Sequence, residues 1–238
     1  MPRVVRGLPG ALALASVVLL SVLPAAVASP HATAPHPRPL IVVPDDPRPD
    51  ARVFVLGDSL TLGTLIYGSP SHLVNAARDD GLALTPRPNA RVGRRVGEGL
   101  AILSHVGAHR TVLIALGTND LSATSAQAAS WIRTARRLAG PTATIFWVNL
   151  RLTGAQFRFQ TRVNAGLLAG VRRDRTAQEL VGATGRAYVL DWSRYAQLHR
   201  IANGRDGIHY SPLNYAKRAD FYTGCIAGVA SFHAYVLR

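Results

Sequence analysis

The chain has 238 residues, 48% of them hydrophobic, which is enough apolar sequence to bury a core and excludes an intrinsically disordered protein. Its single cysteine, Cys225, excludes an internal disulfide, and we expect it to be a small buried residue in a C-terminal helix. The formal net charge is +14, but the arginines stand in small scattered groups, with no basic run that interleaves aromatic residues. This distribution argues against a nucleic-acid partner.

The first 28 residues have the pattern of a secretory signal peptide. Arg3 and Arg6 give a basic start, residues 11–23 form a short and almost wholly apolar stretch, and Pro24 ends it. An Ala-x-Ala cleavage site then ends at Ala28. We therefore predict cleavage after this residue and a secreted or envelope-associated protein, with an uncleaved membrane anchor as the alternative.

Residues 29–50 are predicted to be an extended linker, because seven of these 22 residues are proline. The remaining segment, 51–238, has the length of one globular domain. Removing the two arginines of the signal peptide lowers the net charge from +14 to +12. An exported protein with this charge would be attracted to anionic wall polymers or lipid surfaces.

Five strand-like runs alternate with helical patterns along the domain. Strands in such an alternation form a parallel sheet with helices on both faces, and the continuous apolar character of the third and fourth runs indicates burial on both sides. We therefore predict an α/β fold, a three-layer α/β/α sandwich around a five-stranded parallel sheet. The predicted strands are 52–56, 82–85, 111–116, 144–148 and 187–190, and the predicted helices are 70–80, 96–107, 125–139, 156–182 and 212–235.

The first of these strands runs into Gly57-Asp58-Ser59, which predicts a tight turn with a serine at its tip. Glycine at position 57 lets the backbone bend without a Cβ in the way, and Asp58 is interpreted as shaping the turn. A serine at this place can present its hydroxyl to a cleft, toward which the next helix points its N–H groups. For this stretch alone, a strand followed by a serine helix cap is an equal alternative.

A second candidate segment is Asp206-Gly207-Ile208-His209, near the C-terminus. An Asp and a His three residues apart on a turn can lie on one side, so that the carboxylate orients one imidazole nitrogen. The other nitrogen is then free to take a proton from a serine. Ser211 and Pro212 have the pattern of the cap and first residue of the last helix, which would fix His209 on a loop. A solvated turn is the alternative for this segment alone, and Asp191 is a second candidate for the acid.

Asn119 and Gly93 are candidate donors of hydrogen bonds to an oxyanion. Asn119 belongs to Gly117-Thr118-Asn119-Asp120, which follows the third strand, and its side-chain amide can donate. Gly93 offers a backbone N–H that can come close because the residue has no side chain. With the N–H of Ser59, these groups would make a three-donor oxyanion hole. A turn-forming asparagine and an ordinary turn glycine are the alternatives when each residue is taken by itself.

Together these segments resemble the sequence blocks of the SGNH hydrolases, also called the GDSL esterase and lipase family. The resemblance implies Ser59 as nucleophile, with Asp206 and His209 completing the triad. It also implies that Gly93 and Asn119 donate hydrogen bonds to the oxyanion. The fold that it implies is a flavodoxin-like three-layer sandwich, with no metal and no cofactor. The matching blocks, in order over residues 57–209, are Gly57-Asp58-Ser59-Leu60, Gly93, Gly117-Thr118-Asn119-Asp120 and Asp206-Gly207-Ile208-His209.

An α/β-hydrolase is excluded, because Thr61 stands at the second glycine of Gly-x-Ser-x-Gly and the acid and base are only three residues apart. A softer similarity, to the SGNH domains of bacterial cell-wall O-acetyltransferases, rests on residues 147–149, Asn164, 189–192 and 206–212. The sequence therefore predicts an exported serine esterase that hydrolyses short-chain carboxylic esters, of small molecules or of the cell envelope, through an acyl-enzyme. The alternatives are an O-acyltransferase for cell-wall sugars and a non-catalytic glycan-binding domain.

Overall fold

The computed structural model describes residues 52–68, 71–84, 88–105 and 111–238. The predicted signal peptide, 1–28, and the predicted linker, 29–50, lie outside these residues. Within the described ranges, no helix combines the length and the apolar character needed to cross a membrane.

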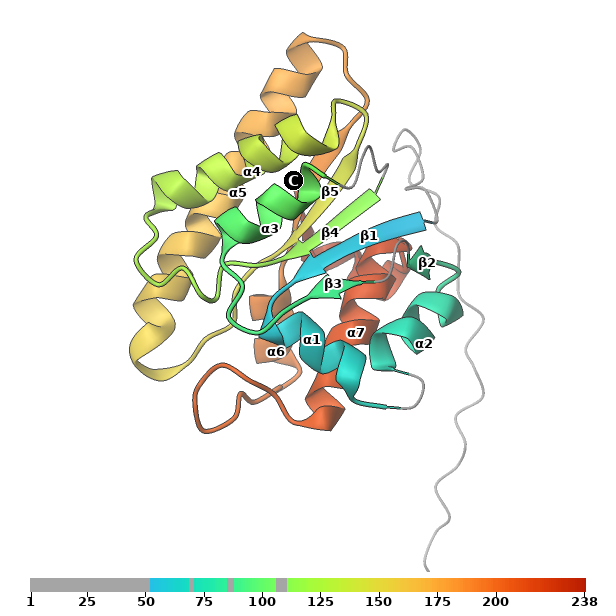
Figure 1. The fold of residues 1–238 in the computed structure, drawn as a ribbon, viewed down its shortest axis with the longest axis vertical. Helices are drawn as coiled ribbons and strands as arrows, with labels where there is room; N and C mark the ends of the chain where they lie inside the picture. Colours follow the sequence, from blue (N-terminus) through green and yellow to red (C-terminus); the bar gives the residue numbers. More distant parts are fainter. Residues whose placement is uncertain (1–51, 69–70, 85–87, 106–110) are drawn as a thin grey trace, which may run out of the picture. The chain divides into compact units, whose positions relative to one another are not determined.

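One mainly parallel sheet forms the centre of the fold (Figure 1). Its strands are β1 (Arg52–Gly57), β2 (Ala83–Leu84), β3 (Asn89–Ala90), β4 (Thr111–Ala115), β5 (Thr144–Val148), β6 (Arg186–Leu190) and β7 (Val236–Leu237). Their order is β2-β1-β4-β5-β6-β7, and β3 pairs with the end of β1 that leads into the serine turn. All pairings are parallel except the one between β6 and β7.

The predicted α/β class and the parallel sheet are confirmed, and each of the five predicted strands overlaps a strand of the structure. The described sheet has seven strands instead of five, because β3 and β7 were not predicted. Each of these strands is two residues long, which is too short to show an alternating pattern in the sequence. β7 adds an antiparallel edge, in which Leu237 pairs with Val189.

Helices cover both faces of the sheet and complete the predicted three layers. On one face lie α3 (Val96–Leu103), α4 (Ser125–Ala139) and α5 (Phe157–Leu180), and on the other lie α1 (Ser59–Ile66), α2 (His72–Asp79), α6 (Trp192–Leu198) and α7 (Pro212–Ile226) (Figure 1). Alternate strand residues enter two separate apolar cores, so that Phe54 faces the first group of helices and Val53 the second. Burial on both sides explains why the central strands read as continuous apolar runs.

The predicted C-terminal helix, 212–235, is too long. α7 ends at Ile226, and a 3-10 helix, η2 (Ala230–Tyr235), follows after a turn. Gly228 makes the turn with φ of +72°, a backbone conformation that ends an α-helix. Two further helices, α1 and α6, were not among the predicted ranges, and both have eight residues or fewer. Cys225 is buried in α7, as predicted.

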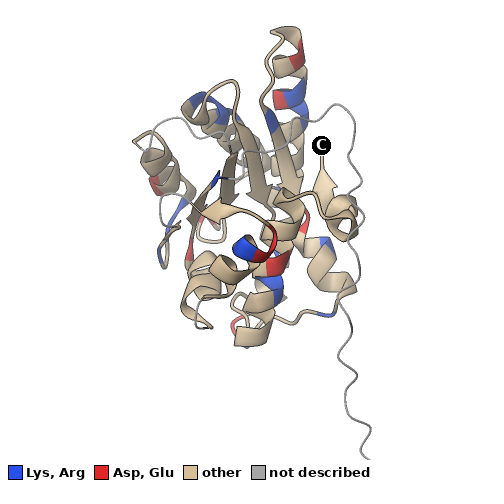
Figure 2. Ribbon diagram, turned by 90° about the vertical axis from the view of Figure 1, so that its right-hand side faces the viewer, with Lys and Arg blue, Asp and Glu red and all other residues tan. Residues whose placement is uncertain are grey.

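The carboxyl ends of β1 and β4 mark the switch point of the sheet. The chain leaves β1 toward β2 and β3, whereas it leaves β4 toward β5 on the other side. In open α/β sheets, ligands bind beyond such a point. Ser59 follows β1 and Asn119 follows β4, so two predicted site residues lie at this edge. Basic residues are distributed over many helices and loops of the fold, as Figure 2 shows.

Candidate active site

Ser59 is the first residue of α1 and directly follows the turn at the end of β1. Asp58 is the helix cap: its Oδ1 accepts a hydrogen bond of 2.9 Å from the N–H of Leu60. The serine hydroxyl is therefore not used as a cap, and Asp58 shapes the turn as predicted. Gly57 is required by a close contact, because a Cβ at this position would lie 2.1 Å from Oγ1 of Thr61. The strand can thus pass straight into the helix.

The candidate acid and base, Asp206 and His209, lie on the loop between α6 and α7. Oδ1 of Asp206 accepts hydrogen bonds from the N–H groups of Ile208 and His209, at 2.9 and 3.0 Å. Ser211 caps α7 and Pro212 is its first residue, as predicted. The three residues Asp206 to Ile208 therefore form a closed turn, and the start of α7 fixes its far end.

The structure brings Ser59, His209 and Asp206 into one line of contacts. Nε2 of His209 lies 3.0 Å from Oγ of Ser59, and Nδ1 lies 2.6 Å from Oδ2 of Asp206. The contact with the imidazole, together with the two backbone N–H groups, lowers the pKa of Asp206 to about 2. Because an ionised carboxylate only accepts hydrogen bonds, Nδ1 carries the proton and Nε2 faces the serine as an acceptor. The side chains of His209 and Asp206 are 46% and 48% exposed, so the line of contacts is open to solvent.

Asp191, the second candidate for the acid of the triad, caps a helix in the structure and does not contact His209. Its Oδ1 accepts hydrogen bonds from the side-chain amide of Asn149 and from the N–H of Arg194, and it caps α6. Nδ1 of His209 contacts Asp206 instead.

Gly93 lies in a turn that leads from β3 into α3 and has φ of +72°. The N–H of Arg94 donates to the carbonyl of Arg91 to close this turn, which requires a left-handed residue at the glycine. The N–H of Arg91 donates to the carbonyl of Gly57, at the end of β1. The turn is therefore fastened beside the start of the serine turn.

Asn119 lies in the turn after β4, and two hydrogen bonds join this turn to the segment that follows Gly93. The side-chain amide of Asn119 donates to the carbonyl of Arg94 at 3.1 Å, and Oδ2 of Asp120 accepts from the N–H of Val96 at 3.0 Å. Within the described part of the chain, the N–H groups of Ser59 and Gly93 make no hydrogen bond. Both groups, and the second N–H of the Asn119 amide, can therefore donate to a ligand.

Arg94 holds these segments together, although no sequence pattern distinguishes it from the other arginines. Its buried guanidinium donates to the carbonyl of Gly57 at 3.0 Å, and to the carbonyl and side chain of Asn89. One side chain thus ties the end of β1 to β3. Its role depends on pairing between distant segments, for which a single arginine in a loop carries no signal.

Residues 149–153, which follow β5, form a support for the histidine loop. The N–H of Thr153 donates to the carbonyl of Gly207, and Asn203 donates to the carbonyls of both Arg151 and Ile208. On the other side of this support, amide side chains of α5 hold its backbone: Asn164 pairs with Leu150, and Gln160 accepts from Leu152.

A cavity of about 350 Å³ lies beside this support, and its mixed polar and apolar lining includes Asn149, Asn164, Asp191 and Leu168. None of Ser59, Asp206 and His209 lines it. Of the residues that carry the softer sequence similarity, Asn164 holds the backbone of Leu150, and Asn149 bonds the start of α6 through Asp191 and the N–H of Ser193. Trp147 and Trp192, from the same segments, are fully buried.

No family model matches this sequence, and no curated protein sequence shows significant similarity to it. Solved structures do match its fold. A carbohydrate esterase of family 3 from Talaromyces cellulolyticus matches with a TM-score of 0.56 and 17% identity, over 74% of this chain and 96% of that one. A lipolytic protein of the G-D-S-L family from Veillonella parvula matches with a TM-score of 0.53 and 15% identity, over 73% and 96%.

A third match is the C-terminal catalytic domain of peptidoglycan O-acetyltransferase A from Streptococcus pneumoniae, solved with a methylsulfonyl adduct. It has a TM-score of 0.52 and 19% identity, and it covers 78% of this chain and 94% of that one. These proteins share the fold of the SGNH hydrolases, and this chain has that fold.

Proposed function

We propose that the chain is a serine esterase that hydrolyses carboxylic esters through an acyl-enzyme on Ser59. The observation that carries this proposal is the line of contacts from Asp206 through His209 to Ser59, which joins residues 150 positions apart in the sequence. A solvated turn or a helix cap, the alternatives for the separate segments, gives no reason for these three side chains to meet. A domain that only binds a glycan has no need of them either.

In the proposed reaction, Oγ of Ser59 attacks the ester carbonyl carbon while Nε2 of His209 takes the hydroxyl proton. Asp206 keeps the other imidazole nitrogen protonated and stabilises the imidazolium that forms. The tetrahedral intermediate then expels the alcohol, which takes the proton from Nε2, and leaves the acyl group on the serine. Water repeats these steps with the same base, and the acid and the free serine are released.

Three groups are proposed to donate hydrogen bonds to the oxyanion of this intermediate. They are the N–H groups of Ser59 and Gly93 and the side-chain amide of Asn119. Support comes from the absence of other partners for both backbone N–H groups among the described residues, and from the hydrogen bonds that hold the two turns together. Donors that are fixed before the reaction stabilise the developing charge without reorganisation, which makes them effective in catalysis.

Asn119→Ala is expected to lower kcat by about 10²- to 10³-fold, as is typical when one donor is lost from a preorganised oxyanion hole. KM should change less, because the carbonyl of the bound ester is a weaker acceptor than the oxyanion. Steady-state kinetics with p-nitrophenyl acetate measure both constants.

Asp120→Ala is the matched control for this substitution. It removes the neighbouring hydrogen bond to Val96 but no donor to the site, so it should lower kcat much less. A normal kcat with a strongly raised KM in Asn119→Ala would mean that the amide only binds substrate.

The substrate is proposed to be an ester of a short acyl group with a bulky or polymeric alcohol. The exposure of His209 and Asp206 leaves the site open to a large leaving group. The predicted export would place such a substrate in the cell envelope. A panel of p-nitrophenyl esters of graded chain length, together with acetylated wall polymers, tests this assignment: the shortest esters should react fastest.

Acyl transfer to a sugar is the second candidate, and the same exposure of the triad favours it, because an acceptor could approach the acyl-enzyme as readily as water. For transfer to be faster than hydrolysis, the effective concentration of the acceptor hydroxyl at the acyl-enzyme must exceed that of water, ~55 M. We place hydrolysis first because both fully buried tryptophans, Trp147 and Trp192, are unavailable for stacking on a sugar. With p-nitrophenyl acetate as donor and chitooligosaccharides as acceptors, free acetate should form faster than acetylated sugar by mass spectrometry. The reverse order would make the chain a transferase.

A further inference from the structure

Arg218, in the second turn of α7, is an arginine whose side chain is enclosed by aromatic rings. Only 3% of its surface is exposed. Its guanidinium carbon lies 4.9 Å from the ring centre of Trp192, 5.1 Å from that of Tyr222 and 5.6 Å from that of Tyr210. Cations at such distances are attracted to the faces of aromatic rings, most strongly where water is excluded. The guanidinium therefore holds three rings from two helices and the loop between them.

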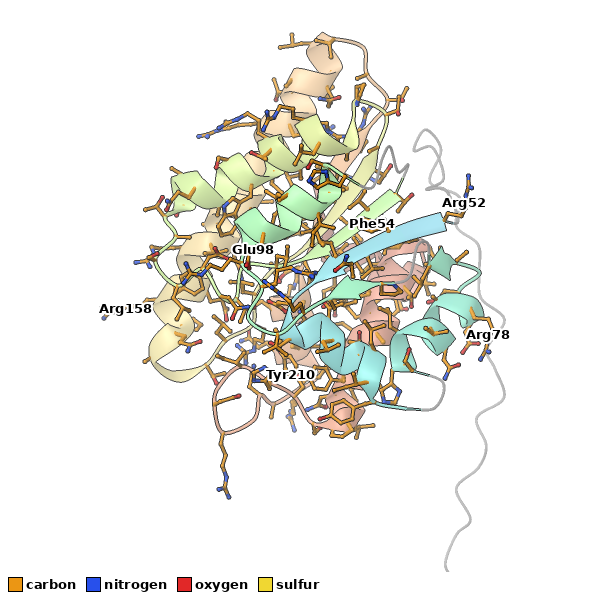
Figure 3. The ribbon with its side chains drawn as sticks, in the orientation of Figure 1. Arg52, Phe54, Arg78, Glu98, Arg158 and Tyr210 are labelled. Carbon is orange, nitrogen blue, oxygen red and sulfur yellow. The ribbon has the colours of Figure 1, made fainter. Side chains whose placement is uncertain are left out.

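One of these rings belongs to the residue next to the proposed base. Tyr210 directly follows His209, and Figure 3 labels it on the loop that leads into α7. The hydroxyl of Tyr210 accepts a hydrogen bond from the indole N–H of Trp192 at 2.9 Å and donates to the carbonyl of Arg151 at 3.3 Å. The ring is thus fixed at its edge by hydrogen bonds and at its face by Arg218. The cation therefore contacts the ring of the residue that directly follows His209 in the chain.

The same cation acts on the residue next to the proposed nucleophile. Asp58 is 1% exposed, and its Oδ1 is used in the cap of α1. Burial raises the pKa of Asp58, while the N–H of Leu60, the charge of Arg218 and a hydrogen bond from the side chain of Thr118 act in the opposite direction. Arg218 is therefore one of the groups that favour the ionised form of this buried carboxylate.

We propose that Arg218 is a positioning residue for the triad: it holds the Tyr210 ring in a fixed place beside His209, and it thereby sets the contact between Ser59 and His209. Its charge also favours the ionised form of Asp58, beside Ser59. This proposal rests on the proposed function, since it concerns the geometry of that reaction. Helix packing alone does not explain the arginine, because an apolar side chain would fill the same space without burying a charge. The α1–α7 contact already has a close apolar component, in which the ring of Tyr215 occupies the place of a Cβ on Gly63.

Arg218→Met is expected to lower kcat by roughly 10- to 100-fold while KM changes by less than about threefold, because small displacements of reacting groups cost rate more than binding. Arg218→Lys keeps the charge but loses the flat guanidinium, and it should restore part of the loss. Both constants are measured with p-nitrophenyl acetate at a temperature where circular dichroism shows a native fold.

Arg136→Met is the matched control. Arg136 is also buried, and it pairs with Asp174 between α4 and α5 and donates to the carbonyl of Ala143, which precedes β5. It therefore lies toward the opposite end of the strands from Ser59. Breaking this pair should lower the melting temperature as much as Arg218→Met does, because the buried carboxylate of Asp174 then has no ionic partner from Arg136. It should leave kcat of the folded enzyme within about twofold of wild type.

Three results would overturn the proposal. The first is a kcat for Arg218→Met within about twofold of wild type. The second is a loss of kcat in Arg136→Met as large as the loss in Arg218→Met. The third is a KM of Arg218→Met that rises by the same factor by which its kcat falls. If Arg218→Met does not fold, Arg218→Lys decides: we expect kcat to fall by at least about fivefold with unchanged KM, and a wild-type kcat contradicts the proposal. Ser59→Ala is measured alongside, because activity in that variant would refute the proposed function itself, whatever Arg218 does.

Discussion

Ser59→Ala is expected to lower ester hydrolysis by on the order of 10⁴- to 10⁶-fold, because the variant has no hydroxyl on which an acyl-enzyme can form. His209→Ala should lose nearly as much, since Oγ of the serine is then left with its proton. The double variant should be little worse than either single variant, because the two residues act as one unit. Initial rates with p-nitrophenyl acetate, corrected for spontaneous hydrolysis, measure all three.

Ser71→Ala is a suitable control for this series. Ser71 caps α2, and its Oγ accepts a hydrogen bond from the N–H of Val74. Removing this hydroxyl should lower the free energy of unfolding by about 1 kcal/mol but removes no group of the candidate site. Its kcat should equal that of wild type. If Ser59→Ala keeps more than about a tenth of the activity, the assignment of the active site is wrong.

Asp206→Asn is expected to lower kcat by about 10³- to 10⁴-fold, although it changes the size of the side chain little. An asparagine can keep its oxygen on the N–H groups of Ile208 and His209, which Oδ1 of Asp206 accepts in the structure. Its NH₂ group then faces Nδ1 of the imidazole, where Oδ2 stood. Two donors cannot share this contact, so the proton moves to Nε2, and the ring can no longer take a proton from Ser59.

Asp191→Asn provides the comparison, because Asp191 is the other carboxylate that the sequence offered as the acid. It should leave kcat unchanged within about threefold, since its oxygen caps α6 and bonds to Asn149. A large loss in Asp191→Asn together with a small loss in Asp206→Asn would reverse the assignment of the acid. Both measurements use p-nitrophenyl acetate at neutral pH, where Asp206, with a pKa of about 2, is ionised in the wild-type protein.

Much of the fold could be predicted because its strands are buried on both sides. Residues 145–148 form a continuous apolar run after Thr144, and the strand predicted at 144–148 has the same bounds as β5. The helix at 125–139 was also predicted with the bounds of α4, and in the structure a capping box of Thr124 and Gln127 defines its start. The C-terminal helix was predicted too long because the apolar pattern continues past Gly228, whose positive φ is not visible in the sequence.

The candidate site could be predicted where its residues stand in local motifs. The turn at Ser59 and the turn at His209 each have a recognisable pattern, and the structure brings their side chains together. Arg94 and Arg218 were missed because their contacts come from distant segments. Arg218 did have one signal: on a helix it shares a face with Tyr215 and Tyr222, three residues before and four after it, so its side chain points into the core. In so arginine-rich a chain, a single arginine on an apolar face is easily overlooked.

The central claim is that Ser59 is the nucleophile, and covalent labelling tests it most directly. The full chain is treated with a fluorophosphonate, digested, and analysed by tandem mass spectrometry, with His209→Ala treated in parallel. We expect one phosphonyl group per molecule, on the peptide that contains Ser59 and at that serine, and a far slower reaction in His209→Ala. A label on another residue, or an active enzyme that takes up no label, would contradict the claim.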